Sequence, residues 1–116
     1  MLAPNSDTKI YLCTGYTDMR KGINGLAILA KSLLSNQFNN GTMFVFRGRS
    51  ADKLKILWWD GQGFCLFYKC LDSGKFTWLK NDIKESIGIT RGQLSMLMEG
   101  IDWRNPKWSK APEYLG

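Results

Sequence analysis

One stretch of the sequence, KLKILWWDGQGFCLFYK from Lys53 to Lys69, constrains the fold more than any other. Bulky apolar residues flank a glycine-rich break, which predicts two antiparallel strands joined by a tight turn. Gly61-Gln62 fits a two-residue type II′ turn, because glycine supplies the positive φ that its first position needs. A type I′ turn at Asp60-Gly61 is the alternative, and it shifts the register by one residue. The type II′ register pairs Trp58 with Cys65, Ile56 with Phe67, Trp59 with Phe64 and Lys55 with Tyr68.

Trp58 and Trp59 are adjacent in the first of these strands, so their side chains point to opposite faces of the sheet. Both are buried only if both faces are covered, and we expect the two helices of so short a chain to fall short of that. One tryptophan is therefore expected at a partner surface or beneath the C-terminal tail. Because tryptophan and arginine are enriched at interface hot spots, the pair favours a binding module.

The other periodicities predict an α+β fold with a mostly antiparallel sheet of about four or five strands and two main helices, in the order β-α-β-β-β-β-α. We expect a single domain over residues 1–116, with its core at about 7–103 and an irregular tail at 104–116. Gly22 and Gly25 weaken the first helix, and close approach to the sheet or to a ligand would explain them. The remaining predicted elements are strands at Lys9–Thr14, Thr42–Gly48 and Phe76–Leu79, a helix from Asp18 to Leu34 with Thr17 as N-cap, and a helix that begins at a Thr90/Gln93 capping box and stops at Gly100.

The composition fits a small folded domain with a moderate positive charge. Of the 116 residues 44% are apolar, which is too many for a disordered chain. The 16 Lys and Arg against 10 Asp and Glu give a net charge of +6. That excess suits a polyanionic partner, although it serves solubility equally well. No apolar run approaches ~18 residues and no secretory signal is recognisable, so we expect a cytoplasmic protein with no membrane partner.

Residue types that carry catalysis are scarce. Histidine, the usual acid–base group near neutral pH, is absent. Asp18, Asp60 and Asp102 show no diagnostic spacing, and no nucleotide-binding or zinc motif is present. We therefore expect no enzyme activity, catalytic residue, metal or cofactor, with a metal-dependent nuclease built on Asp18 or Asp60 as a minor alternative. Three cysteines are expected to be buried, reduced thiols: Cys13, Cys65 and Cys70.

Basic residues follow the predicted central strands and the start of the first helix. Arg47 and Arg49 share parity in an extended chain, so we expect them to project on one side, and Lys53 and Lys55 likewise. On neighbouring strands they would form a cationic stripe that follows phosphates, with aromatic rings nearby to stack on unpaired bases. The solvated face of an ordinary sheet has the same pattern. The candidate nucleic-acid contacts are Arg20, Lys21, Arg47, Arg49, Lys53, Lys55 and Lys69.

The two aspartates beside these cations also have structural interpretations. Asp18 suits the start of a helix, where a negative charge is favourable, and Asp60 suits a turn. Arg20 has an alternative role, because an ion pair with Asp60 or Asp52 would tie the helix to the hairpin without any ligand.

Four segments together resemble a known family: TDMRKGINGL (17–26), FVFRGRSADKLKILWWDGQGFCLFYK (44–69), GKFTW (74–78) and QLSMLMEGIDW (93–103). They are similar to the TnpB accessory proteins of the insertion sequence 66 family of bacterial transposable elements, which are unrelated to the RNA-guided nucleases of the same name. The resemblance covers roughly residues 7–106. It marks as structural motif residues Thr17, Asp18, Gly22, Trp58, Asp60, Gly61 and Gly63.

The resemblance implies a small, non-catalytic accessory protein that assists DNA transposition beside a separate transposase. Its expected partners are DNA at the element ends, the transposase and another accessory subunit. The alternative is a pure protein–protein adaptor that docks through Trp59, Trp103 and Trp108 and does not touch DNA. This sequence departs from the family pattern at Cys70, where arginine is frequent, and at Leu79, where proline is frequent.

Overall fold

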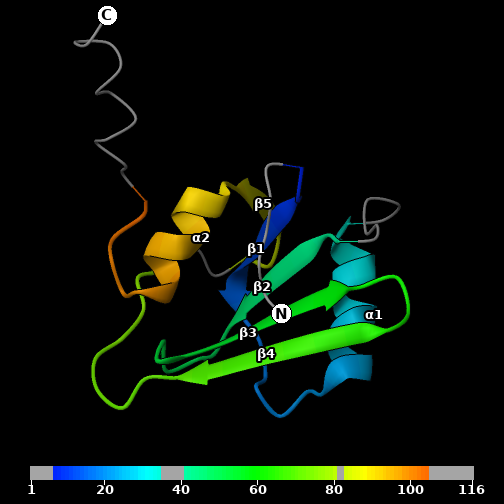
Figure 1. Cartoon of the computed structure of the whole chain (residues 1–116). Coiled ribbons are helices and arrows are strands. Elements are labelled where there is room, and N and C mark those ends of the chain that lie inside the picture. The colour runs from blue at the N-terminus through cyan, green and yellow to red at the C-terminus, as the bar shows by residue number, and fades with distance from the viewer. Residues whose placement is uncertain (1–6, 35–40, 81–82, 105–116) are drawn as a thin grey trace, which may run out of the picture.

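The computed structural model describes residues 7–34, 41–80 and 83–104. None of the helices in these ranges is long and apolar enough to cross a membrane. The α+β class and the expected order of elements are confirmed (Figure 1). The elements are β1 (Ile10–Tyr16), α1 (Ile23–Leu34), β2 (Met43–Arg47), β3 (Lys53–Trp59), β4 (Phe64–Cys70), β5 (Ser86–Ile89) and α2 (Arg91–Met98).

The five strands form one sheet in the order β4-β3-β2-β1-β5. Neighbouring strands are antiparallel except β1 and β2, which run parallel because α1 carries the chain back across the sheet between them. A parallel pair needs such a crossover connection, whereas the other adjacent strands of this sheet do not. One consequence is that the carboxyl ends of β1 and β2 meet at the same edge.

The β3–β4 hairpin has the predicted type II′ register, with Trp59 opposite Phe64. Gly61 has φ +98°, the conformation that glycine adopts without strain. The Asp60 carboxylate accepts the backbone N–H groups of Gln62 at 2.8 Å and Gly63 at 2.9 Å. Asp60 is therefore the turn residue that the sequence predicts.

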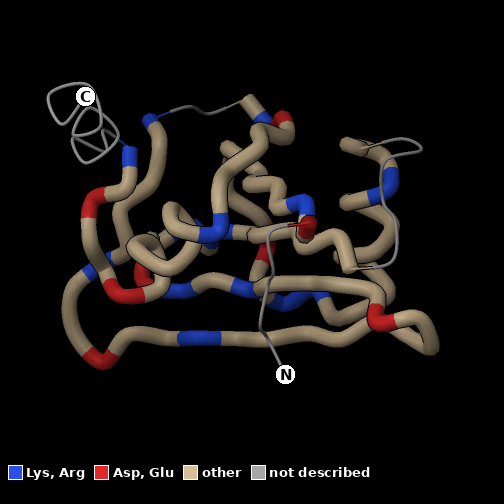
Figure 2. Tube along the Cα trace, turned by 45° about the horizontal axis from the view of Figure 1, so that its top comes forward, with Lys and Arg blue, Asp and Glu red and all other residues tan. Residues whose placement is uncertain are grey.

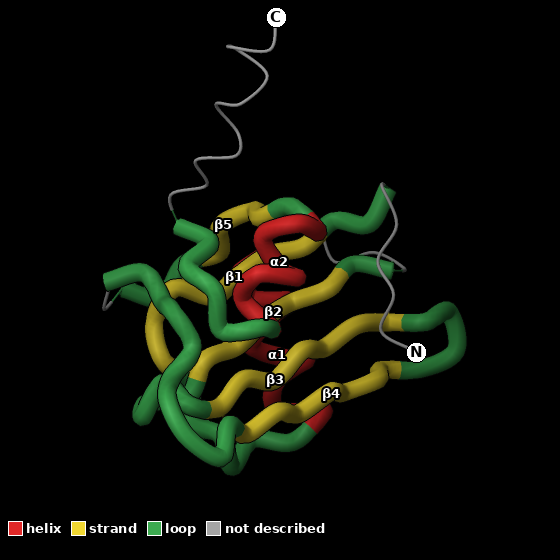
Figure 3. The backbone as a smooth tube through the Cα atoms, turned by 60° about the vertical axis from the view of Figure 1, so that its left-hand side comes forward, coloured by secondary structure: helices red, strands yellow, loops and turns green. Residues whose placement is uncertain are grey.

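The two helices lie on opposite faces of the sheet (Figure 3). On one face α1 packs on a cluster that contains Phe44, Phe46 and Leu57, and on the other α2 packs on Ile56 and its neighbours. Two helices do not cover both faces alone, as expected. The irregular segment 71–80 completes the α2 side, so both faces are covered and Trp58 and Trp59 are each half-buried.

The predicted strand at Phe76–Leu79 is wrong, because these residues have no strand beside them. Phe76 and Trp78 are buried in the core, and both donate to the carbonyl of Ala51, at 2.9 Å from the Phe76 backbone N–H and 3.1 Å from the Trp78 indole N–H. The strand in its place is β5, which pairs with β1.

The predicted start of the first helix is also wrong, because α1 begins at Ile23 and not at Asp18. The N-cap position belongs to Gly22, whose carbonyl accepts the N–H of Leu26 at 3.0 Å. Thr17 instead extends the β1–β2 pairing by donating its N–H to the carbonyl of Arg47 at 2.8 Å. The residues between Thr17 and Gly22 form a separate loop. The sequence did not indicate this loop, because its residue types also occur in helices.

The second helix is confirmed in detail. Thr90 and Gln93 form the expected capping box, with the Gln93 N–H donating to the Thr90 hydroxyl at 3.0 Å and the Thr90 N–H donating to the Gln93 side chain at 2.9 Å. Gly100 follows the last turn with φ +77°, a typical helix C-terminal conformation. Among the cysteines, only Cys13 is buried as predicted. Cys65 is half-buried and Cys70 exposed, because both lie on β4 at the edge of the sheet.

Candidate functional site

A cleft of about 700 Å³ opens where the carboxyl ends of the parallel strands β1 and β2 meet. In sheets with parallel strands, ligands characteristically bind beyond the carboxyl ends of those strands. Two loops form the walls: loop 17–22 after β1 and loop 48–52 after β2. The cleft is lined by Tyr16, Thr17, Asp18, Met19, Arg20, Gly48, Arg49, Ser50 and Lys53.

Tyr16 is the large aromatic residue of the cleft, and an irregularity in β1 sets its position. The pairing of β1 with β2 shifts between Leu12 and Tyr16, so that Tyr16 and not Thr14 lies opposite Arg47. Bulges of this kind bend a strand and redirect its side chains. Tyr16 is 48% exposed, and the Arg49 guanidinium lies 5.6 Å from the centre of its ring, within cation–π range.

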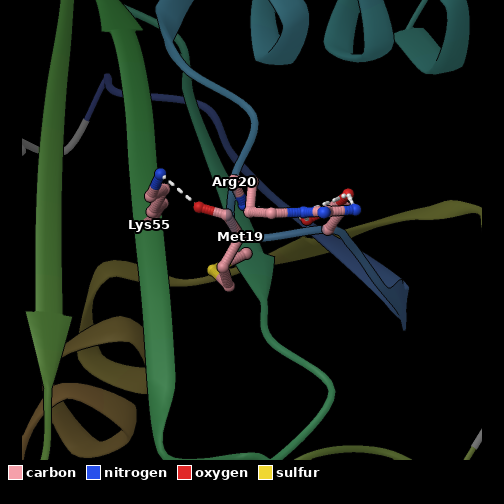
Figure 4. Close-up of polar contacts among 4 residues, drawn as sticks. Met19, Arg20 and Lys55 are labelled. Carbon is pink, nitrogen blue, oxygen red and sulfur yellow. Dashed lines mark hydrogen bonds and ion pairs between the residues drawn. The ribbon is translucent and has the colours of Figure 1, made fainter.

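Lys55 of β3 holds loop 17–22 in place through hydrogen bonds to its backbone. Its side chain is only 6% exposed, and its ammonium donates to the carbonyl of Met19 at 2.8 Å and to that of Lys21 at 2.9 Å. Figure 4 shows Lys55 reaching the Met19 carbonyl while Arg20 points away from it. A buried ammonium needs such acceptors, because an unpaired buried charge is costly. Lys55 is thus occupied inside the protein.

Arg20 projects from the same loop into solvent, with a side chain 92% exposed. Its guanidinium donates to both carboxylate oxygens of Asp18, at 2.8 to 3.2 Å. These bonds, together with the backbone N–H of Arg20, hold the pKa of Asp18 at about 2. The alternative ion pair of Arg20 with Asp60 or Asp52 is wrong, because Asp60 closes the hairpin turn and Asp52 binds Lys53 at 3.2 Å.

Loop 48–52 is held by the covering segment on the other side of the sheet. Ala51 has φ +69°, a left-handed conformation that is unfavourable for residues other than glycine. Its carbonyl accepts the two hydrogen bonds from Phe76 and Trp78 described above, which offset that strain. Strained backbone of this kind is frequent at ligand sites.

Gly48 makes a close approach between the two loops. A Cβ on it would lie 2.9 Å from Cγ of Met19 and 3.3 Å from Cβ of Lys53. Neither glycine for which the sequence suggests close approach shows it: a Cβ on Gly22 would meet nothing within 4 Å, and one on Gly25 only methylenes of Lys21.

The seven candidate cations do not form one continuous stripe, and Lys and Arg lie on several sides of the trace with acidic residues between them (Figure 2). Arg20, Arg49 and Lys53 line the cleft, and Lys21 is exposed on the same loop as Arg20. The structure separates the others. Arg47 lies over the ring of Trp78 at 5.6 Å, Lys69 donates to the carbonyl of Met98 at 2.8 Å, and Lys55 is buried.

One of the two pairs of cations projects on a common side as predicted, and the other does not. Lys53 and Lys55 lie on the same face of β3, because the strand is regular there. Arg47 and Arg49 diverge because β2 ends at Arg47 and the chain turns at Gly48.

The three candidate docking tryptophans have different positions. Trp59 is half-buried and packs edge-on against Phe64, with ring centres 5.1 Å apart. Trp103 is 3% exposed, and its indole N–H donates to the carbonyl of Thr77 at 2.8 Å, so it belongs to the core. Trp108 lies outside the described residues.

Sequence reasoning missed Tyr16, Gly48 and Ala51 as parts of the site. Gly48 lies between two arginines at the end of a predicted strand. This was the feature of the sequence that could have indicated a closely packed loop. Nothing in the sequence indicated the register shift that exposes Tyr16. In the described ranges no group of three or more His, Cys, Asp and Glu residues is placed to hold a metal ion.

Comparison of the sequence with known proteins shows related chains. A family model described as "IS66 Orf2 like protein" matches residues 8–108. The uncharacterized protein y4hO of Sinorhizobium fredii is 43% identical over 116 residues, which is 100% of both chains. The uncharacterized protein y4jC of the same organism is 35% identical over 108 residues, which is 92% of this chain and 91% of the relative. No solved structure matches this chain.

Proposed function

The chain belongs to the family of IS66 Orf2-like proteins, and we propose that it assists transposition by binding DNA through the cleft between loops 17–22 and 48–52. Family membership implies the accessory role in insertion-sequence transposition. The proposal adds that the protein acts by binding and not by catalysis. The cations assigned to DNA phosphates are Arg20, Lys21, Arg49 and Lys53.

The observation that carries the proposal is the convergence on one cleft of Arg20 from loop 17–22, Arg49 from loop 48–52 and Lys53 from the start of β3. They are separated by up to about thirty residues in the sequence, yet the meeting of β1 and β2 carboxyl ends brings them to one rim. Arginine and lysine side chains at such positions neutralise phosphates and release condensed counterions. Lys55, Lys69 and Arg47 are excluded from the interface, because internal contacts occupy them.

Salt dependence tests this proposal. Labelled duplex DNA from an element end is titrated with protein at several salt concentrations. Each neutralised phosphate contributes a slope of about −0.9 in log K against log salt, so four contacts predict a slope of about −3.6. Arg20→Glu and Arg49→Glu should each weaken binding and make the slope less negative by about 1 or more.

Arg91→Glu is the matched control. Arg91 is exposed and follows Ile89, which pairs with Ile10 at the start of β1, so it lies at the opposite end of the sheet from Tyr16. A change at Arg91 should leave the affinity close to that of the wild type. Absence of binding at low salt, or an equal loss from Arg91→Glu and Arg49→Glu, contradicts the cleft as the DNA site.

A second candidate function is that of an adaptor that docks on the transposase. A row of half-buried apolar side chains on the α1 face of β3 and β4 favours it: Trp59, Phe64 and Leu66. Large aromatic side chains at such positions are frequent interface anchors.

Co-purification with the transposase from a nuclease-treated lysate tests the adaptor. Trp59→Ala should abolish the association, whereas Trp58→Ala should keep it, because Trp58 is equally half-buried but faces the α2 side. Circular dichroism checks that both variants fold. Retention of the transposase by Trp59→Ala contradicts this docking surface.

A further inference from the structure

Tyr16 and Arg49 form a solvent-exposed cation–π pair at the cleft. Tyr16 is 48% exposed and Arg49 is exposed, and neither belongs to the buried clusters on the two faces of the sheet. The guanidinium lies 5.6 Å from the ring centre. Core packing therefore does not account for an aromatic residue at this position.

The net positive charge at the cleft is smaller than the number of its cations indicates, because two of these cations form ion pairs with aspartates. Asp18 binds Arg20 at 2.8 Å, and Asp52 binds Lys53 at 3.2 Å. Within the described residues, Arg49 is the cation of the cleft lining that forms no ion pair. Phosphate attraction alone is therefore modest, and tight binding calls for a second kind of contact.

The shape of the cleft indicates what that contact is. Its volume of about 700 Å³ lies in the range of pockets that enclose small ligands, which is roughly 300–1,000 Å³. A nucleotide fits such a space, whereas a duplex is much wider. Duplex DNA presents its bases by their edges in the grooves, so their flat faces are available to a tyrosine only when they are unpaired.

We propose that the cleft binds an unpaired nucleotide of single-stranded DNA, with the base stacked on Tyr16 or on the Arg49 plane. Arg20 on loop 17–22 and Lys53 at the start of β3 both line the cleft and would hold the flanking phosphates. Aromatic rings and arginine planes stack on any base, so the site recognises an unpaired strand and not a sequence. This inference rests on the proposed DNA binding and specifies its substrate as a single strand or a frayed duplex end.

Fluorescence anisotropy with three labelled DNAs tests the inference: a single strand, a blunt duplex of the same sequence, and that duplex with a short single-stranded extension. The wild type should bind the single strand and the extended duplex about 5-fold or more tightly than the blunt duplex. Tyr16→Leu should remove this preference, and Tyr16→Phe should retain it, because only the ring is needed.

Tyr68→Leu is the matched control. Tyr68 is 46% exposed and also has a cation over its ring, Lys55 at 4.6 Å, but it lies on β4 outside the cleft lining. This variant should keep the preference for unpaired DNA. If Tyr16→Leu does not fold, Arg49→Gln in the exposed loop takes its place, with the same loss of preference expected.

The outcomes separate this inference from the proposed function. Equal affinity for blunt and extended duplexes, unaffected by Tyr16→Leu and Arg49→Gln, overturns single-strand recognition and leaves DNA binding standing. Failure to bind any of the three DNAs at low salt overturns both. Binding of a poly-glutamate peptide in place of DNA also overturns both, and it assigns the cleft to an acidic protein partner.

Discussion

Lys55 shows how a charged side chain in a buried position can determine where other charges lie. Its ammonium is satisfied by two backbone carbonyls of loop 17–22, so it does not need a carboxylate or solvent. These two hydrogen bonds hold in place the loop from which Arg20 projects into solvent. A lysine that looks like a phosphate contact in the sequence is thus a positioning residue for the cleft.

Lys55→Met tests this role. Methionine preserves the apolar stem but leaves the carbonyls of Met19 and Lys21 without their donor, so we expect a loss of about 1–3 kcal/mol in the free energy of unfolding. Urea unfolding measures that loss, and hydrogen exchange should show faster exchange in loop 17–22. Lys75→Met, in the exposed segment after β4, should change neither quantity. Unchanged protection of the loop in Lys55→Met contradicts the positioning role.

Asp18 makes the stability of the protein sensitive to acid. Hydrogen bonds from Arg20 hold the pKa of Asp18 at about 2 in the folded protein, against roughly 4 in an unfolded chain. A lowered pKa stabilises the fold above about pH 4, and this contribution disappears as the pH falls toward 2. The urea midpoint should therefore fall less steeply over this window in Asp18→Asn than in the wild type. Salt should reduce the difference, because both partners are exposed.

Asp72→Asn is the control for that measurement, because it removes one exposed negative charge from the turn after β4. It should follow the wild-type midpoint between pH 4 and pH 2. A wild-type curve parallel to that of Asp18→Asn contradicts a stabilising ion pair at Asp18.

At the scale of elements, two loops form the cleft, and a different element holds each loop. Loop 17–22 rests on β3 through Lys55, and loop 48–52 is fixed through Ala51 by the segment that contains Phe76 and Trp78. Gly48 sets the distance between the loops where it meets Met19. The cleft therefore depends on packing from both layers.

Gly48→Ala tests the close approach. The new methyl group would lie 2.9 Å from Cγ of Met19, so we expect overpacking to lower the free energy of unfolding by about 1–3 kcal/mol. The double variant with Met19→Ala should recover part of that loss, because it removes the clashing methylene. Gly88→Ala is the control, since a Cβ there meets nothing within 4 Å. Equal effects of the two glycine variants contradict a special role for Gly48.

The sequence was sufficient for elements with strong local chemistry and insufficient where distant contacts decide. The hairpin register followed from Gly61 and the alternation around it, and the start of α2 followed from the Thr90 capping box. The strand predicted at Phe76–Leu79 failed because alternation does not reveal whether a neighbouring strand is present. The site was predicted only in its cations, because Tyr16 enters the cleft through a register shift with β2.

At the scale of the whole molecule, the sheet is covered on both faces but has accessible side chains at its β4 edge. Burial decreases from the middle of the sheet to that edge: β2 is almost fully buried, whereas β4 is half-buried or exposed throughout. The exposed cations assigned to the cleft, Arg20, Lys21 and Arg49, lie on loops and not on strands. The two proposed binding surfaces therefore lie at the rim of the sheet and at its β4 side.

The three cysteines differ in burial in the same way as the strands that carry them. Cys13 is fully buried, and burial raises the pKa of its thiol, whereas Cys70 is exposed. Because the thiolate is the reactive form, a thiol reagent should modify Cys70 first, Cys65 more slowly and Cys13 only after unfolding. Mass spectrometry of the native and urea-unfolded protein measures the order. Rapid modification of Cys13 in the native protein contradicts its placement in the core.

The pairing of β5 with β1 joins the last strand of the described residues to the first. A polypeptide emerging from the ribosome exposes Ile10–Tyr16 long before Ser86–Ile89 has been translated. Throughout that interval, the outer side of β1 presents open backbone donors and acceptors, and such open sides attract other extended chains. The described sheet is therefore completed only after Ser86–Ile89 has been synthesised, and a polypeptide that stops before Ser86 lacks the strand that covers the outer side of β1.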